Sequence, residues 1–396
     1  MKKSVSIIGG GPAALILAAS LDCKKFKVTL YEKNKTVGRK FLVAGKGGFN
    51  LTHSEPITEL IARYTPAHFL REALDEFDNH DFRNWLDSIG VPTYVGSSKR
   101  VYPVIGIKPI TVLNAIITVL EKQTVDIRYN HIWTGWTSKG ALVFNTDTEI
   151  QSDYTIFALG GGSWKITGSD GTWLATFKKQ DIPVAPFQSS NCGYHVNWPK
   201  DFIIEHEGSP VKNIAISCLN KSQKGEAVIT HFGLEGNAIY ALSPQIREEL
   251  EKHQKAIVCI DLKPSLSYTD VLHKIQKSIF KKTSETLQKE VKLSSVQIGL
   301  LKNYLSKETY LNPELLAQHI KELPIEIMGS SLLNEAISTS GGIHLTAVDE
   351  HFELKKMKRH YCIGEMLDWD APTGGYLLQA SFSMGKYLAK HLNSLH

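Results

Sequence analysis

The segment from Ser4 to Lys33, SVSIIGGGPAALILAASLDCKKFKVTLYEK, predicts how the amino-terminal part of this chain folds. Its apolar run at residues 5–8 has the length of a buried strand, and three consecutive glycines follow that run. Small apolar residues over 12–21 favour a helix, and residues 27–31 favour a second strand. A strand, a glycine turn, a helix and a second strand in this order are typical of the first unit of a Rossmann-type α/β fold.

The glycines belong to a dinucleotide-binding fingerprint of the form G-x-G-x-x-A, with Gly9, Gly11 and Ala14 at its defined positions. We expect Gly9 to make the tight turn, Gly11 to let the backbone approach a pyrophosphate, and Ala14 to keep the helix close to the sheet. Pro12 and Ala13 open the helix, and its first N–H groups face the phosphates, with the helix dipole adding to the attraction. These five residues are therefore predicted to bind the cofactor.

An acidic residue, Glu32, ends the second strand eighteen positions after Ala14. At this place an acid accepts hydrogen bonds from the ribose of a bound dinucleotide, and Lys33 beside it is assigned to the same site. A ligand-free unit of this kind would leave Glu32 unexplained. A secretory signal would not interrupt its apolar core with glycines and a proline. We therefore predict a bound dinucleotide.

The composition is that of an ordinary soluble protein of 396 residues, long enough for two or three domains. With 42% hydrophobic residues and no run of eighteen apolar ones, no membrane span is expected. The five cysteines are scattered without metal-ligand spacing, so no metal is expected and a reducing cytoplasm fits best. The net charge of +5 permits an anionic partner such as nucleic acid but does not require one.

A second glycine-rich loop, VGRKFLVAGKGGFNLTH at residues 37–53, follows the predicted ribose-binding acid. Its glycines allow close backbone approach, and Arg39, Lys40 and Lys46 can neutralise a diphosphate. Its position beside the predicted nucleotide favours contact over a solvated loop.

The stretches GGGPAALILAA, YEKNKTVGRK and GKGGFNLTHSE together resemble the BaiN-like family of NAD(P)/FAD-dependent flavoproteins. The resemblance implies FAD as the cofactor, with Asn50 and Leu51 beside it, and NAD(P)H as a transient electron donor. Phe49 stands where many relatives have cysteine, which is typical of a side branch and puts in question any mechanism that uses that thiol as an acid.

The resemblance also assigns roles to three later motifs. Ile132, after a strand at 125–129, is implied to contact the adenine through its backbone. Gly160 and Gly161, after a strand at 154–159, are implied to pass close to the FAD diphosphate.

The closing motif lies near the carboxyl end of the chain. Gly364 and Glu365 are implied to meet the ribityl chain and the pyrophosphate. The N–H groups near Gly375 and Tyr376, which open the last helix, are implied to point at the flavin pyrimidine edge. Cys362 is expected to be buried and inert.

The fold class expected is α/β: a Rossmann-type, glutathione-reductase-like FAD domain with an inserted domain that is part β-barrel-like and part helical. We place the FAD domain at 1–186 and 337–396, and an inserted substrate or cap domain at 187–336. Within the first part, residues 57–92 are expected to be helical, and a helix at 111–122 is expected to be capped by Pro109 and Thr111. No second strand-GxGxxG-helix unit is visible, so no standing nicotinamide site is expected.

By this resemblance, the function expected is that of an FAD-dependent oxidoreductase that reduces an activated C=C bond by hydride transfer from reduced flavin. Family members with assigned roles act on unsaturated bile-acid intermediates or on a uridine of ribosomal RNA, so a small molecule or RNA is the expected substrate. His231 and Tyr376 are the catalytic candidates, with Tyr102 and His53 as further candidates for the acid. An FAD-dependent oxidase or monooxygenase, and a non-catalytic flavin-containing RNA-binding factor, are the alternatives. The oligomeric state stays open.

Overall fold

The protein is described by a computed structural model that covers residues 1–43, 48–146 and 148–395. The chain divides into two compact units, residues 1–188 together with 333–396, and residues 189–332. The expected insert, 187–336, begins two residues before the second unit and ends four residues after it. Its role as a substrate or cap domain stays a prediction.

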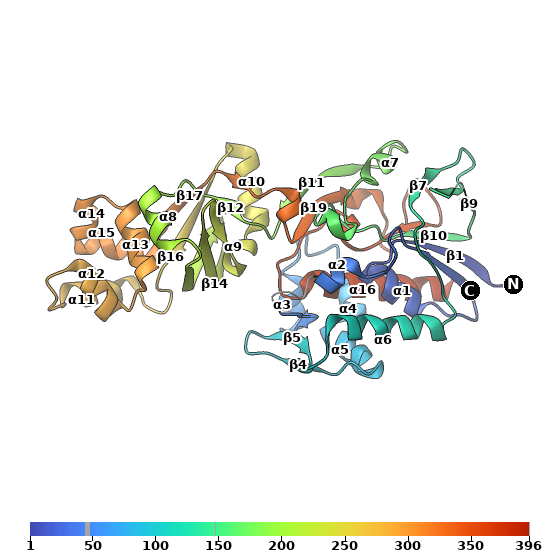
Figure 1. The fold of residues 1–396 in the computed structure, drawn as a ribbon, viewed down its shortest axis with the longest axis horizontal. Helices are drawn as coiled ribbons and strands as arrows, with labels where there is room; N and C mark the ends of the chain where they lie inside the picture. Colours follow the sequence, from blue (N-terminus) through green and yellow to red (C-terminus); the bar gives the residue numbers. More distant parts are fainter. Residues whose placement is uncertain (44–47, 147, 396) are drawn as a thin grey trace. The chain divides into compact units, whose positions relative to one another are not determined.

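The first unit is built on a five-stranded parallel sheet in the order β20-β10-β1-β2-β6 (Figure 1). The strands are β1 (Lys3–Ile8), β2 (Phe26–Tyr31), β6 (Asp126–Arg128), β10 (Tyr154–Phe157) and β20 (His360–Cys362). At the end of the central strand, Ile8 lies level with Tyr31 on one side and with Phe157 on the other. The glycine turn and the predicted ribose-binding acid therefore meet at one edge of the sheet, where open α/β sheets bind their ligands.

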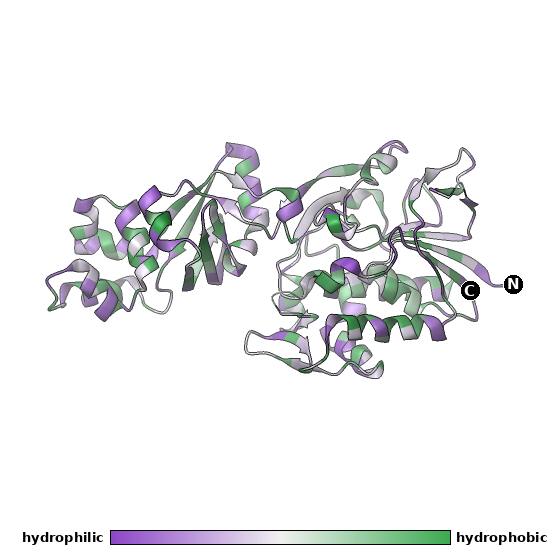
Figure 2. Ribbon diagram, in the orientation of Figure 1, coloured by the Kyte–Doolittle hydropathy of each residue, from purple (hydrophilic) through white to green (hydrophobic). Residues whose placement is uncertain are grey.

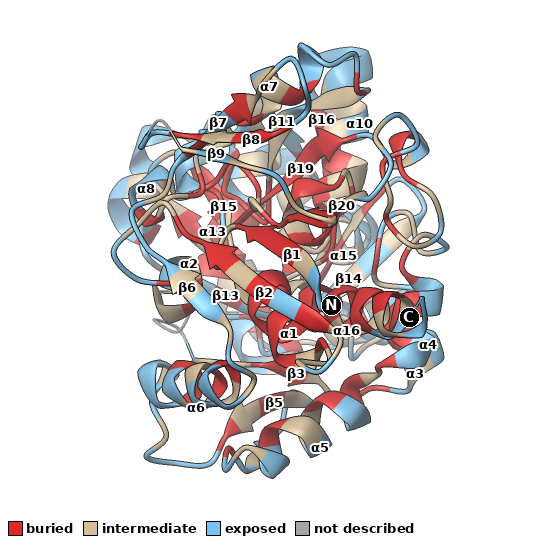
Figure 3. Ribbon diagram, turned by 90° about the vertical axis from the view of Figure 1, so that its right-hand side faces the viewer, coloured by how far each residue is buried: buried red, intermediate tan, exposed pale blue. Residues whose placement is uncertain are grey.

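Two layers cover this sheet (Figures 1 and 3). One face carries the helices α1 (Pro12–Ser20), α6 (Pro109–Lys122) and α16 (Tyr376–Ser394), and the other an antiparallel sheet of β7 (Trp133–Trp136), β8 (Leu142–Phe144) and β9 (Glu149–Ile150). The Trp133 ring lies 4.8 Å from the Phe157 ring, and aromatic packing of this kind joins the small sheet to the large one.

Helix α1 is apolar on all sides, as Figure 2 shows, and residues 13–19 are buried. A helix of this kind must be covered by other elements, and α16 packs directly on it. Gly385 makes that packing possible, because a Cβ there would overlap Cγ2 of Ile16 and lie 2.7 Å from the carbonyl oxygen of Ala13. No motif in the sequence pointed to Gly385.

The remaining elements of the first unit are short. They are α2 (Arg39–Val43), β3 (Thr52–His53), α3 (Ile57–Ile61), α4 (Arg71–Glu76), α5 (Asn79–Ser88), β4 (Thr93–Val95), β5 (Arg100–Pro103) and α7 (Leu174–Lys178). Strands β3, β5 and β4 form a small antiparallel sheet in that order. Strand β11 (Val184–Ser190), which runs past the boundary between the units, pairs with β19 (Ser338–Ile343).

Two expectations about helices were wrong. Residues 57–92 form three separate helices, with Pro66 in the segment between α3 and α4, where proline removes a donor and disfavours helix continuation. Asp78 then starts α5 as its N-cap by accepting the N–H groups of His80 and Asp81. Neither Pro109 nor Thr111 caps α6, because Lys108 is its N-cap and Pro109 its first residue.

The second unit combines a seven-stranded antiparallel sheet with helices. The sheet order is β17-β16-β13-β14-β15-β12-β18, from β12 (Tyr194–His195), β13 (Pro210–Cys218), β14 (Lys221–Thr230), β15 (Gly233–Glu235), β16 (Ala256–Asp261), β17 (Leu323–Ile327) and β18 (Gly329–Ser330). Only Met328 separates β17 at one edge from β18 at the other, so the sheet curls back on itself. This curl agrees with the barrel-like expectation.

The helices of the second unit lie mostly between β16 and β17 in the chain, as expected for a partly helical domain. They are α8 (Lys200–His206), α9 (Asn237–Tyr240), α10 (Ser243–His253), α11 (Tyr268–Gln276), α12 (Thr283–Thr286), α13 (Ser295–Tyr304), α14 (Lys307–Leu311) and α15 (Pro313–Lys321). None of the described helices in either unit combines the length and hydropathy that crossing a membrane requires.

Candidate functional site

The three glycines after β1 have different surroundings. Gly9 has φ +106°, and a Cβ on it would overlap the carbonyl oxygen of Ala158 at the end of β10. The N–H of Gly10 donates to Oε2 of Glu32 at 2.8 Å, and a Cβ there would lie 2.8 Å from the same atom. Gly11 has φ −82°, and no described atom lies within 4 Å of where its Cβ would be. Packing therefore requires Gly9 and Gly10, whereas Gly11 leaves room at the amino end of α1 for a ligand.

Glu32 is buried and holds the turn after β1 against the segment after β2. Besides the Gly10 bond at Oε2, its Oε1 accepts hydrogen bonds from the backbone N–H of Asn34 at 2.8 Å and from the side chain of Asn34 at 2.6 Å. An ionised carboxylate has about four acceptor positions, so one position remains for a ribose hydroxyl.

Three residues predicted to contact the FAD phosphates and ribityl chain meet although they lie far apart in the sequence. The Lys40 ammonium lies 2.9 Å from Oε2 of Glu365 and 2.8 Å from Oγ of Ser163. Oε1 of Glu365 also accepts the N–H of Thr339 at 3.2 Å. A Cβ on Gly161 would overlap Oγ1 of Thr339 and lie 3.0 Å from Cδ of Glu365. Lys40, Gly161 and Glu365 therefore form one cluster.

Two of the other three predicted basic residues bind segments of the protein itself. Lys33 pairs with Asp170 at 2.8 Å. Burial alone would raise the pKa of Asp170, but the hydrogen bonds from Lys33 and Thr172 outweigh it and lower that pKa. Arg39 donates to the side chain of Asn34 at 3.0 Å and to a backbone carbonyl at 3.1 Å. Lys46 lies outside the described residues.

The glycines after β10 and β20 approach other parts of the site closely. Gly160 has φ +72°, and its carbonyl accepts the indole N–H of Trp173 at 3.1 Å. Gly364 has φ +83°, and a Cβ on it would lie 3.2 Å from the Cβ of Ala13. The motif after β20 is therefore beside the amino end of α1, as a shared diphosphate site requires. Ala14 is fully buried at this helix end.

The segment before β3 offers one hydrogen-bond donor without a partner. The side-chain nitrogen of Asn50 is buried, and no described residue accepts a hydrogen bond from it. Leu51 is fully buried, and its N–H donates to the carbonyl of Val101 at 2.8 Å. Ile132 is exposed, and its N–H already donates to the side chain of Asn145 at 2.8 Å. Asn50 is therefore the predicted residue best able to donate to a ligand through its side chain.

The start of α16 lies directly on β3. Gly375 has φ +100°, and a Cβ on it would lie 2.6 Å from the Cα of Thr52. Thr52 also donates to Oε1 of Gln379 in the next turn of the helix at 2.6 Å. The Asn50–His53 segment and the first turn of α16, both assigned to the cofactor, are thus one packed structure.

Glu55, which sequence reasoning missed, is buried beneath this structure with only 3% of its side chain exposed. Its Oε2 accepts Nη2 of Arg63 at 2.9 Å, and its Oε1 accepts the Tyr376 hydroxyl at 2.6 Å. Burial alone would raise the pKa of Glu55, but these two hydrogen bonds outweigh it and lower that pKa. Burial, followed by the bond to Glu55, raises the pKa of Tyr376, so Tyr376 stays protonated.

Two further residues flank Tyr376. The His53 ring stacks on the Tyr376 ring with centroids 5.2 Å apart, and burial lowers the pKa of His53. Arg100 lies beside the loop that enters α16, because a Cβ on Gly374 would be 3.3 Å from its Nε. Arg63 pairs with Glu55, whereas within the described ranges no carboxylate lies at ion-pair distance from Arg100. Arg100 is a second candidate that sequence reasoning did not single out.

The remaining acid candidates lack such surroundings. His231 belongs to the second unit, its side chain is 71% exposed, and its Nδ1 lies 3.3 Å from a carboxylate oxygen of Glu207. Tyr102 in β5 stacks on Tyr94 with ring centroids 5.7 Å apart. Cys362 is fully buried, and burial raises the pKa of its thiol well above the usual range, which fits the expected inert role.

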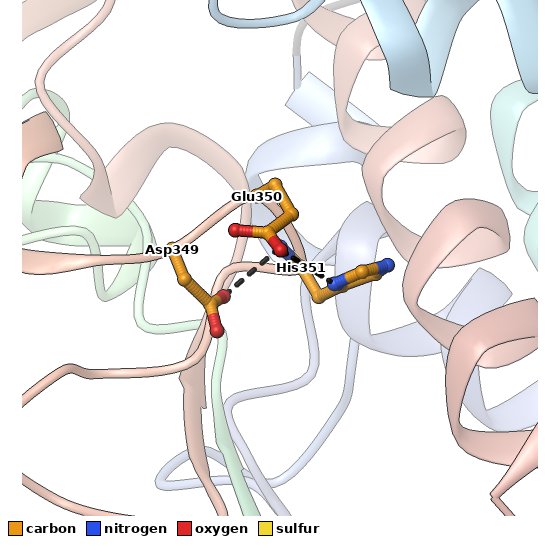
Figure 4. A group of neighbouring side chains, drawn as sticks. All are labelled: Asp349, Glu350 and His351. Atoms are coloured by element: carbon orange, nitrogen blue, oxygen red, sulfur yellow. Dashed lines mark hydrogen bonds and ion pairs between the residues drawn. The ribbon is translucent and has the colours of Figure 1, made fainter.

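One group in the described chain has the residue types of a metal site, Asp349, Glu350 and His351, whose ligand atoms lie within 4.8 Å of one another (Figure 4). Oδ1 of Asp349 already accepts the N–H groups of His351 and Glu353 at 2.9 Å. The Glu350 side chain is 70% exposed. The hydrogen bonds of the local turn account for the proximity of these side chains. The prediction that the protein binds no metal stays a prediction.

A parallel sheet whose central strand ends in a glycine turn, bonded to an acid at the end of the next strand, is the arrangement of dinucleotide-binding Rossmann proteins. The chain belongs to the HI0933-like protein Rossmann domain family, whose model matches residues 3–391. It is thus an FAD-dependent flavoprotein of the oxidoreductase class. The resemblance and the fold class inferred from the sequence are confirmed.

Two relatives align with nearly the whole chain. A ribosomal RNA dihydrouridine synthase of Haemophilus influenzae is 23% identical, over 95% of this chain and 95% of the relative. A 3-dehydro-bile acid delta(4,6)-reductase of Clostridium scindens is 24% identical, over 97% of each. Among solved structures, 3-ketosteroid delta1-dehydrogenase from Sterolibacterium denitrificans is 11% identical, over 100% of both chains, with a TM-score of 0.49. That structural likeness is too distant to carry a functional argument.

Proposed function

We propose that this protein reduces a carbon–carbon double bond conjugated to a carbonyl group, with NAD(P)H as the electron donor and a cytoplasmic location. The names of both relatives describe the reduction of such a bond, in a bile acid for one and in a uridine of ribosomal RNA for the other. Their alignment over at least 95% of this chain supports a shared reaction type. The two names differ in substrate, so the substrate itself is left to experiment.

The single observation that carries the proposal is the fit of the site to FAD. Gly11 leaves open space at the amino end of α1, where N–H groups and the helix dipole favour a phosphate. Glu32 keeps one acceptor position for a ribose hydroxyl, and Asn50 has a buried amide donor without a partner among the described residues. We infer that these residues, with the cluster of Lys40, Gly161 and Glu365, hold the cofactor.

Arg100 is the side chain best placed to act on the substrate. The chemistry that FAD supplies when bound is delivery of hydride to a substrate carbon. Arg100, close to the amino end of α16, can hold the carbonyl oxygen of a substrate and stabilise negative charge there. Tyr376 is less suited to give up a proton, because its raised pKa and its hydrogen bond to Glu55 both retain that proton. His231, which lies in the second unit, stays a predicted catalytic candidate.

The test begins with an absorbance spectrum of the purified protein and continues with anaerobic addition of NADH or NADPH. Flavin bands that bleach with one nucleotide, and return when a steroid enone or a uridine-containing ribosomal RNA fragment is added, would establish the reductase and name its donor and substrate class. Reoxidation by oxygen coupled to product formation would favour an oxidase or monooxygenase instead. A protein that takes up no FAD after reconstitution would contradict the proposal.

A further inference from the structure

We propose that Glu55 is a positioning residue of the FAD site, which fixes the first turn of α16 against the Asn50–His53 segment and places a buried negative charge beneath both. The inference rests on the proposed FAD site. It assigns a role to the last residue of the GKGGFNLTHSE stretch, a residue for which the sequence patterns indicated no function.

The first turn of α16 is held through the residue that opens it. The hydroxyl of Tyr376 donates to Oε1 of Glu55 at 2.6 Å, and the backbone carbonyl of Tyr376 accepts the hydroxyl of Tyr64 at 2.8 Å. Both ends of Tyr376 are therefore fixed, and all three residues lie in the first unit. A hydrogen bond to an ionised acceptor is about twice as strong as a neutral one, so Glu55 makes the tighter of these two links.

The Asn50–His53 segment is held by hydrogen bonds to α5 and to α16. The side-chain amide of Asn79, which is buried, donates to the carbonyls of His53 at 2.6 Å and of Glu55 at 3.0 Å. The Thr52 hydroxyl donates to Gln379 on α16. Glu55 is thus fixed to α5 through its backbone and to α16 through its side chain, and any shift of Glu55 moves both segments assigned to the flavin.

The negative charge of Glu55 should also affect the reduction potential of bound FAD, apart from the hydrogen bonds that Glu55 makes. Glu55 is almost fully buried, and its hydrogen bonds lower its pKa, so it is ionised at neutral pH. Its counterion is Arg63, whose side chain is 38% exposed and therefore partly screened by water. A fixed negative charge beneath the amino end of α16 opposes extra negative charge on a bound cofactor. The reduction potential of bound FAD should consequently be lower with Glu55 ionised than without it.

A merely structural ion pair would affect folding alone, so the test separates folding, affinity and potential. Glu55→Gln keeps the size and an acceptor for Tyr376 but removes the charge. Tyr376→Phe removes the link to α16 but keeps the Glu55–Arg63 pair. Glu59→Gln is the matched control, because it removes an exposed carboxylate from α3, which lies between Glu55 and Arg63 in the chain.

The measurements are the FAD dissociation constant, the flavin midpoint potential and the melting temperature of the protein without added FAD. We expect Glu55→Gln and Tyr376→Phe each to weaken FAD binding by about tenfold to a hundredfold, the size expected when a supporting residue is lost. The double variant should bind FAD no more weakly than the weaker single one, because Tyr376→Phe removes the link to Glu55 that Glu55→Gln only weakens. The potential should rise in Glu55→Gln and stay near wild type in Tyr376→Phe.

Wild-type affinity and wild-type potential in a folded Glu55→Gln variant would overturn the inference while leaving the proposed function intact. Effects equal to those of Glu59→Gln would do the same. If Glu55→Gln does not fold, unchanged FAD affinity in Tyr376→Phe overturns the positioning role. A wild-type protein that binds no FAD would remove the proposed function and this inference together.

Discussion

The ammonium group of Lys40 lies 2.9 Å from Oε2 of Glu365, although the two residues are 325 positions apart in the chain. The pair joins helix α2 to the motif after β20, and only 27% and 16% of the two side chains are exposed. Each residue was assigned to the cofactor from a different sequence motif, and no contact between the two was predicted. Their pairing means that neither can be changed without affecting the other.

The first prediction is that Lys40→Met destabilises the fold by about 1–2 kcal/mol, because it leaves the half-buried Glu365 carboxylate with one neutral N–H partner, that of Thr339. The double variant Lys40→Met with Glu365→Gln should recover part of that loss. Urea unfolding followed by circular dichroism measures both. Lys35→Met, at an exposed position between β2 and α2, is the control and should be within about 0.5 kcal/mol of wild type. Equal stability of the Lys40 and Lys35 variants would contradict the prediction.

The second prediction separates stability from binding within the glycine turn. Gly9→Ala should destabilise the protein strongly, because its φ of +106° and its contact with Ala158 both exclude a Cβ. Gly11→Ala should leave the melting temperature nearly unchanged, because its φ of −82° suits alanine and no described atom is within reach. Its methyl group would instead occupy the space assigned to the pyrophosphate, so FAD affinity should fall by about tenfold or more. Retained FAD affinity in Gly11→Ala would remove that residue from the site.

The sequence indicated the local parts of this molecule correctly. The turn at Gly9, the burial of Ala14 and the end of β2 at Tyr31 just before Glu32 follow from neighbouring residues, because a glycine pattern and an apolar run report on local backbone. The region 57–92 was harder. Its apolar residues follow a helical spacing without interruption, although the region forms three helices. The only local signs of the two breaks are Pro66 and the N-cap residue Asp78.

The supporting residues of the site could not be read in the same way. Glu55 and Tyr376 are 321 residues apart, and no spacing rule connects them before the fold is known. In the sequence, Glu55 is an acid after a loop, a pattern more typical of an exposed residue. Gly385 lies inside an ordinary helical stretch, so its contact with α1 left no local signal.

The third prediction concerns that helix contact. Gly385→Ala should destabilise the protein by about 1–3 kcal/mol, since the new methyl group would overlap Ile16 and press on the carbonyl of Ala13. Alanine is normally the better helix former by about 1 kcal/mol, so a loss of stability would show that packing outweighs propensity. Thermal unfolding measures the change. Gly385→Ala combined with Ile16→Leu, which has no branch at Cβ and therefore lacks the overlapping Cγ2, should lose less stability than the two single variants lose in sum. A stabilised single variant would refute the contact.

The last prediction concerns the pH dependence of stability around His53. Burial lowers the pKa of His53 below its ordinary 6.5, despite the nearby Glu55 carboxylate, so the folded protein binds this proton less readily than the unfolded chain does. Stability must therefore decrease as pH falls through 6.5, the direction in which the unfolded state takes up more protons. The lowered pKa of Glu55 adds a loss in the same direction, but only below its ordinary 4.5.

His53→Asn keeps an acceptor for the N–H of Glu55 and removes the titrating ring, so between pH 7 and pH 5 its free energy of unfolding should fall less than that of wild type. The slope should shrink rather than vanish, because burial also lowers the pKa values of His360 and His391. Urea unfolding at pH 5, 6 and 7 gives the slopes, with His68→Asn as the control. If His53→Asn and wild type lose the same free energy of unfolding over this range, His53 is not the partly buried group with a lowered pKa that its place against Tyr376 implies.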